Sequence, residues 1–210
     1  MTLFPQHHNL INSRRCGDTM RAIGLFFLAA VLASASAADL EFDEYVQRGN
    51  AAQKRGDWES AASQFAQALN HADLPNDDAT RSAMNLEYGR AMGVLCHYRE
   101  AEKYLLRAKA FAESAKGSLF RPLYELGAVS LAQKKYVGAA IYFAAMEREA
   151  REKLSPWLVA DALEKTAAAM AASGRSVEAS SRLLEADRIR DARPPAPPPG
   201  TITPHGAQCP

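Results

Sequence analysis

The chain has little of what would build a disulfide scaffold, a β-sheet or a nucleic-acid surface. Three cysteines in 210 residues are too few for a disulfide scaffold, so we expect packing to supply the stability. Aromatic residues make up 8% and no long alternating run of β-branched residues occurs, which favours helices. The net charge of +1 lacks the basic excess of a nucleic-acid-binding domain.

Long apolar runs are also missing, except near the amino terminus. There Arg21 precedes an apolar run over residues 22–32, which gives way to alternating alanine and serine. This order is typical of a secretory signal peptide, and we predict cleavage after Ala37. The alternative is an uncleaved anchor over residues 22–38, but its 17 residues fall below the roughly 20 needed to span a bilayer.

The predicted functional start is Met20, because Met20-Arg21 and the apolar run form a compact signal without residues 1–19. Arg14-Arg15 suggests a twin-arginine signal only weakly, since Cys16-Gly17-Asp18 follows where apolar residues are expected. Residues 1–37 hold three of the 25 basic and one of the 24 acidic residues, so their removal leaves a net charge of −1. We therefore expect a periplasmic or secreted protein of a bacterial cell envelope.

Proline is scarce in the middle of the chain and concentrated at its end. Residues 191–210 hold seven of the eleven prolines and bury too little apolar surface to offset the cost of ordering. We predict an extended, disordered and mobile tail there, and a folded domain over residues 38–190. Cys96 and Cys209 could form a disulfide, but a free or intermolecular Cys209 is favoured because nothing in the sequence orients the pair.

What the sequence does have is an internal repeat. Small residues recur at intervals of 40, 38 and 40, at Gly49, Gly89, Gly127 and Ala167. An alanine follows each of them twelve residues later, and a large residue follows each alanine after four more. The alanines are Ala61, Ala101, Ala139 and Ala179, and the large residues are Phe65, Leu105, Phe143 and Leu183. Periods of 20 to 50 residues indicate stacked supersecondary units.

Each unit predicts two helices joined by a short turn. Gly56 can close a first helix in the left-handed conformation, Ser155 and Ser176 can cap helices, and Pro122 can open one. Glycine or alanine at the crossing allows the two backbones to approach, and the large residue then fills the groove between adjacent units. The predicted fold is an all-α solenoid with helix pairs at about 39–77, 78–117, 118–154 and 155–190.

These residues resemble the tetratricopeptide repeat (TPR). The family's small residue, its aromatic after the turn and its small-large-small series match over most of residues 39–190, the aromatics being Trp58, Tyr98 and Tyr136. The 38–40 interval exceeds the family's 34, so the helices should be longer by about a turn. The resemblance implies a right-handed superhelix of about eight helices, whose first helices line a concave surface that binds a peptide or helix.

The resemblance also identifies candidate groove residues. Positions of the family's carboxylate clamp fall on Asn50, Arg121, Val46, Glu87 and Glu125, and the two acidic residues would repel a carboxylate. The clamp is therefore disfavoured, and a largely apolar strip in the last two units is the better candidate. The predicted partner-binding residues are Asn50, Lys54, Arg90, Tyr124, Ala128 and Leu131. The alternative is that these side chains are buried between helices.

Catalytic and metal-binding patterns are weak. His71, His97 and His205 lie far apart, and none pairs with a cysteine or carboxylate at metal-ligand spacing. Cys96 and His97 could be a nucleophile and base, but adjacent side chains at a turn diverge. We expect an adaptor that binds a protein or peptide, with no catalysis, cofactor, metal, nucleic acid, small-molecule substrate or lasting membrane span. The alternatives are a permanent structural subunit of an envelope complex and, less favoured, an enzyme with an unrecognised site.

Overall fold

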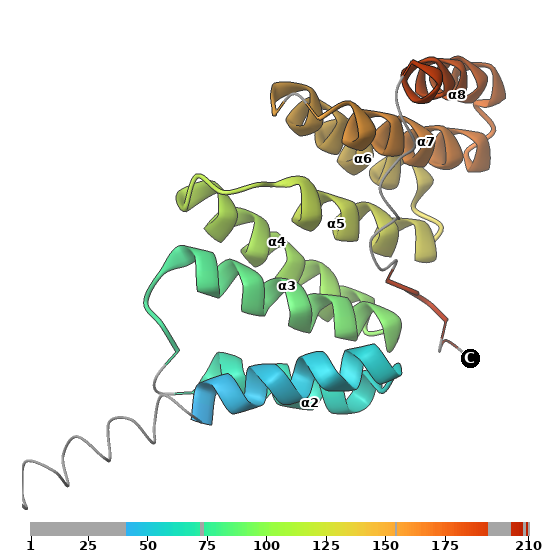
Figure 1. The fold of residues 1–210 in the computed structure, drawn as a ribbon. Helices are drawn as coiled ribbons and strands as arrows, with labels where there is room; N and C mark the ends of the chain where they lie inside the picture. The colour runs from blue at the N-terminus through green and yellow to red at the C-terminus, as the bar shows by residue number, and fades with distance from the viewer. Residues whose placement is uncertain (1–40, 72–73, 154, 193–202, 208, 210) are drawn as a thin grey trace, which may run out of the picture. The chain divides into compact units, whose positions relative to one another are not determined.

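The computed structural model describes residues 41–71, 74–153, 155–192, 203–207 and 209, so the predicted signal peptide lies outside the described part. Every regular element within these residues is a helix, which confirms the all-α prediction (Figure 1). Residues 41–55 form the first helix. It is followed by α2 (Trp58–Asn70), α3 (Asp78–Val94), α4 (Tyr98–Ser114), α5 (Phe120–Ala132), α6 (Tyr136–Glu152), α7 (Pro156–Ala172) and α8 (Ser176–Asp191).

The helices follow one another in space as they do in the chain. From α2 to α8, each packs against the next helix, and α3 also packs against α5. Successive short turns and neighbour-to-neighbour packing define a helical-repeat solenoid. The α3–α5 contact aligns two helices separated by a third, so residues of both helices can contribute to one surface.

The helix ends agree with the sequence only in part. Asp57 caps α2 by accepting a hydrogen bond from the Ser60 backbone N–H at 3.1 Å. Ser155 holds the N-cap position of α7 but makes no capping hydrogen bond through its side chain. The predicted Ser176 cap is wrong, because Ser176 is the first residue of α8 and Arg175 holds the N-cap. Helix α5 begins two residues before Pro122.

The glycines of the repeat mark the closest helix crossings. A β-carbon on Gly49 would lie 2.8 Å from the Phe65 ring, and one on Gly127 would lie 2.5 Å from the Phe143 ring. No side chain fits at such distances, so glycine is required for the approach. The large residue thus packs on the glycine of its own helix pair. It also belongs to a core cluster with residues of the next pair, as predicted: Phe65 with Met84 of α3, and Phe143 with Ala162 of α7.

Four turns between helices share one backbone conformation. Gly56, Cys96, Lys134 and Gly174 all have positive φ, at 76°, 67°, 59° and 84°. Their spacing follows the 40, 38, 40 rhythm of the repeat. Glycine adopts this conformation freely, whereas a side chain makes it unfavourable. Cys96 and Lys134 therefore occupy a position that favours glycine.

Candidate functional site

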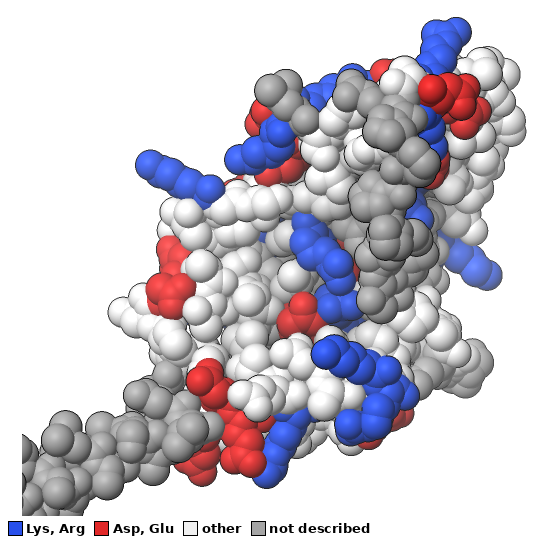
Figure 2. All heavy atoms as spheres, in the orientation of Figure 1, with Lys and Arg blue, Asp and Glu red and all other residues white. Residues whose placement is uncertain are grey.

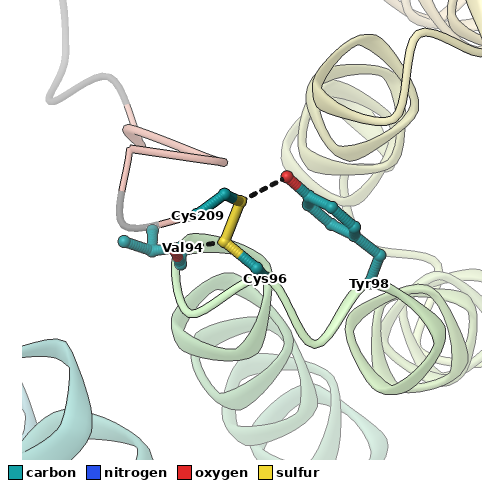
Figure 3. Close-up of a disulfide and its surroundings, with 4 residues drawn as sticks. All are labelled: Val94, Cys96, Tyr98 and Cys209. Carbon is teal, nitrogen blue, oxygen red and sulfur yellow. Dashed lines mark hydrogen bonds between the residues drawn. A yellow bond between two sulfur atoms is a disulfide. The ribbon is translucent and has the colours of Figure 1, made fainter.

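The end of the chain lies on the solenoid. Cys209 forms a disulfide with Cys96, at the turn between α3 and α4, with the two Cα atoms 5.6 Å apart (Figure 3). The prediction that Cys209 is free or bonded to another chain is therefore wrong. Residues 203–207 and 209 also have a defined place in the structure, although the sequence predicted a mobile tail there. That prediction considered apolar burial alone, whereas a covalent bond and polar contacts hold this segment. The rest of the predicted tail, apart from Asp191 and residue 192, lies outside the described residues.

The disulfide is flanked by Tyr98, the first residue of α4, and by Gly206 of the carboxyl-terminal segment, residues 203–207 and 209. The Tyr98 hydroxyl lies 2.8 Å from Cys209 Sγ and donates to it, since a disulfide sulfur carries no proton (Figure 3). Gly206 has a φ of +76°, and a β-carbon there would lie 2.9 Å from the Tyr98 hydroxyl oxygen. Both the backbone conformation and the space next to Tyr98 therefore require glycine at this point of the segment.

A buried carboxylate on α5 receives the side chains of the segment. Glu125 has no exposed surface, and its Oε1 accepts a hydrogen bond from the Thr203 hydroxyl at 2.9 Å. Its Oε2 lies 2.8 Å from His205 Nε2. His205 Nδ1 is buried and has no hydrogen-bond partner among the described residues. A proton on Nε2 is therefore the favoured tautomer, since an unpaired buried N–H on Nδ1 would be costly.

Two arginines complete the surroundings of this carboxylate. Arg90 Nε on α3 lies 3.1 Å from Glu125 Oε1 and donates to Thr203 Oγ1 at 2.9 Å. Arg121 Nε donates to Glu125 Oε1 at 3.1 Å. Burial raises the pKa of Glu125, but the hydrogen bond from His205 and the charges of the two arginines outweigh it, so the pKa lies below its ordinary value.

Arg90 is also held by residues of the solenoid itself. Its guanidinium pairs with Glu87 one turn earlier on α3, and Glu87 accepts a second hydrogen bond from Gln53 Nε2 at 2.9 Å. Arg90 is only 6% exposed. The arginine predicted to meet a partner is therefore buried and engaged by its own chain.

An open cavity lies beside the segment. It has a volume of about 380 Å³ and is lined by Tyr124, Ala128, Leu131, Ala132, Phe143, Lys165, Thr203, Pro204 and His205. Lys165 of α7 stands with its ammonium nitrogen 5.8 Å from the centre of the Tyr124 ring. Three predicted groove residues, Tyr124, Ala128 and Leu131, thus come together here. The other two, Asn50 and Lys54, are exposed on the first helix and do not line this cavity.

The described surface shows no other site of clear chemistry. The face in Figure 2 carries acidic and basic side chains intermixed. Among the described residues, no group of three or more histidine, cysteine or acidic side chains is placed to hold a metal ion. None of the described helices combines the length and apolarity needed to cross a membrane.

Solved structures of low sequence identity share this fold. The crystal structure of BtubC (BKLC) from P. vanneervenii matches with a TM-score of 0.69 and 17% identity, covering 89% of this chain and 80% of that one. A kinesin light chain-like protein of Podosopora anserina, described as having nearly identical TPR-like repeats, matches with a TM-score of 0.63 and 18% identity. That match covers 72% of this chain and 75% of the other. Neither a protein-family model nor a curated protein sequence matches the chain.

The described residues therefore have a TPR-like helical-repeat fold. The structural neighbours, the succession of short-turned helices and the close glycine crossings all agree on this fold. At these identities the likeness extends to the fold alone.

Proposed function

We propose that the chain is an exported, non-catalytic interaction scaffold that binds an extended peptide of a partner protein on the surface of α3, α5 and α7. The single observation that carries the proposal is the chain's own carboxyl-terminal segment on that surface. Thr203 is 4% exposed there, and its hydroxyl is bonded to residues of two helices. A surface that holds one peptide by side-chain contacts is suited to hold another.

The cavity beside the segment supplies the apolar part of the proposed groove. Tyr124, Ala128 and Leu131 offer an apolar lining on α5, and Lys165 brings a positive charge from α7. The partner that fits is an extended peptide with an apolar side chain for the cavity and an acidic neighbour for Lys165. Apolar lining with a few polar groups at fixed places is the usual composition of a specific binding site.

Export rests on the predicted signal peptide and is supported by the Cys96–Cys209 bond, since disulfides persist in oxidising compartments. Sequencing the amino terminus of the mature protein tests this part, and the expected first residue is Ala38 or one close to it. Recovery of peptides from residues 1–19 in envelope fractions would contradict both the start at Met20 and the cleavage.

A permanent subunit of an envelope complex is the second candidate. It is favoured by exposed apolar residues on α8, where Val177 is 82% and Leu183 is 44% exposed. A scaffold with exchangeable partners should purify as a soluble monomer, whereas a permanent subunit should be insoluble without its partner.

Site-specific photo-cross-linking tests the groove directly. A photoreactive amino acid replaces Leu131 in the cavity or, as the control, Val177 on α8. We expect a discrete cross-linked partner from position 131 that is lost when Tyr124→Glu is added, and no such product from position 177. Equal products from both positions, or none from position 131, would refute the groove.

A further inference from the structure

We propose that the polar site around Glu125 recognises a peptide in which a hydroxyl side chain stands two residues before a histidine. Thr203 and His205 of the chain itself are the ligand held there in this structure. The inference rests on the proposed function and states which side chains the partner peptide must carry. It also separates the polar site, which the tail occupies, from the open apolar cavity beside it.

The carboxylate geometry carries the choice of ligand. Each oxygen of Glu125 takes one donor from the segment, the Thr203 hydroxyl on Oε1 and His205 Nε2 on Oε2. The same hydroxyl accepts from Arg90, so it satisfies a donor and an acceptor at once. A ligand without both donors would leave buried groups unpaired, and that omission is heavily penalised. A partner's carboxylate would face Glu125 and be repelled.

The second recognised residue of the ligand, which is His205 in this structure, lies against Gly93 of α3, where a flat ring fits. A β-carbon on Gly93 would lie 2.3 Å from His205 Nδ1 and 2.7 Å from Cε1. The His205 side chain is 2% exposed, and the Gly206 backbone N–H donates to the Gly93 carbonyl at 3.3 Å. Pro204, between the two recognised residues, is exposed and makes no polar side-chain contact. The motif is therefore a hydroxyl residue, any residue, then histidine.

The disulfide makes it harder for an outside peptide to enter. The segment competes from within the same molecule in any case, at an effective concentration on the order of millimolar, and the Cys96–Cys209 bond ties it to the site a second time. An external dithiol can open this bond. One thiolate attacks Cys209 Sγ, the Cys96–Cys209 bond breaks as a mixed disulfide forms, and the second thiol then displaces Cys209. The dithiol supplies two electrons and ends as a disulfide, and both cysteines end as protonated thiols.

Fluorescence anisotropy with a labelled peptide tests the inference. The probe is Thr-Ile-Thr-Pro-His-Gly-Ala, the sequence of residues 201–207, and the proteins are full-length chains. The oxidised wild type is compared with Cys209→Ser and with a triple variant that adds Thr203→Ala and His205→Ala to empty the site. We expect the triple variant to bind the probe at least about 100-fold more tightly than the oxidised wild type, the usual gain from removing a tethered competitor.

Two controls confine the result to the proposed contacts. A probe with alanine in place of its histidine should bind the triple variant at least about 10-fold more weakly, because one oxygen of the buried carboxylate loses its donor. Adding Gly93→Ala to the triple variant, in which the chain's own segment no longer competes, should abolish probe binding by filling the ring site. Circular dichroism of each variant checks that the helices remain.

The outcomes separate this inference from the proposed function. Equal binding to the oxidised and triple-variant chains, or equal binding of the two probes, would overturn the hydroxyl–histidine site. If Leu131 still cross-links to a partner in that case, the scaffold function stands without this motif. If the probe binds as expected while the Leu131 cross-link is absent, the motif stands and the apolar groove fails.

Discussion

The ring of His205 lies where a side chain on Gly93 would have to be. A β-carbon on Gly93 would come within 2.3 Å of His205 Nδ1 and within 3.0 Å of a Val129 methyl group. In the register of the repeat, Gly93 corresponds to Leu131 and Ala171, so a residue with a side chain occupies this position in the later units. The missing side chain makes room for the end of the chain.

Gly93→Ala should release the segment while sparing the helix. Alanine favours a helix over glycine by up to about 1 kcal/mol, so α3 should not weaken, but the ring of His205 loses its place. We expect the fraction of chains with a Cys96–Cys209 bond in a glutathione buffer to fall, measured by thiol labelling and mass spectrometry. Gly138→Ala is the matched control, because a β-carbon on Gly138 would lie 3.9 Å from Ser130 Oγ, an ordinary contact distance.

Acidification should remove the stability that Glu125 contributes. Its pKa is lowered in the folded chain, so its contribution is fully present above its ordinary value of 4.5 and is lost as the pH falls through the lower folded value. The groups that set this dependence are His205, Arg90 and Arg121. We expect Glu125→Gln to be less stable than the wild type at pH 7 by about 1 to 3 kcal/mol.

The two proteins should converge as the pH falls well below 4.5. Urea denaturation at several pH values measures this difference directly. A gap between wild type and Glu125→Gln that stays constant with pH would contradict the buried, ionised carboxylate.

Substitutions at Cys96 separate the disulfide from the backbone strain. Cys96→Ser removes the bond but keeps a side chain at a φ of 67°, whereas Cys96→Gly removes both. We expect Cys96→Ser to lose about 2 to 4 kcal/mol under oxidising conditions. Cys96→Gly should lose about 1 kcal/mol less, because glycine tolerates the left-handed conformation. Identical denaturation midpoints for wild type and Cys96→Ser would show that the bond does not stabilise the fold.

Crossing residues and cavity residues should respond differently to substitution. Ala139 is fully buried at a helix crossing, so Ala139→Leu should destabilise the chain by about 1 to 3 kcal/mol through overpacking. Leu131 is partly buried and lines the open cavity, so Leu131→Glu should lower the thermal midpoint much less than Ala139→Leu does while abolishing the Tyr124-dependent cross-link. Unfolding of Leu131→Glu at the temperature of Ala139→Leu would make Leu131 a core residue.

The fold was predictable because its cause is local and repeated. The spacing of Gly49, Gly89 and Gly127 records a steric need that recurs at each crossing, and short turns bring the two helices together. The occupied polar site was not predictable in this way. It joins Gly93 and Glu125 to residues about 80 to 110 positions later in the chain, and nothing in the repeat register fixes where that end lies.

Two departures from the repeat could have indicated the site. Cys96 stands where Gly56 and Gly174 stand in two other units. Lys134 shows that a side chain is tolerated there, so the indication is the thiol at this turn and not the positive φ alone. Gly93 stands where the later units have Leu131 and Ala171, and a β-carbon there would meet both the His205 ring and a Val129 methyl group of α5. That a carboxylate is disfavoured at Glu125 stays a prediction, whereas the ability of Glu125 to hold a hydroxyl and a histidine depends on three-dimensional contacts that the sequence does not contain.

Peptide mass mapping of the full-length protein without reductant tests the central claim most directly, namely that the end of the chain occupies the surface of its own solenoid. The chain is purified with its free thiols blocked from the moment of lysis and is digested under non-reducing conditions. We expect one linked species that joins the Cys96 and Cys209 peptides, recovered from monomeric protein. Free Cys209, or a Cys209–Cys209 link between two chains, would contradict the account.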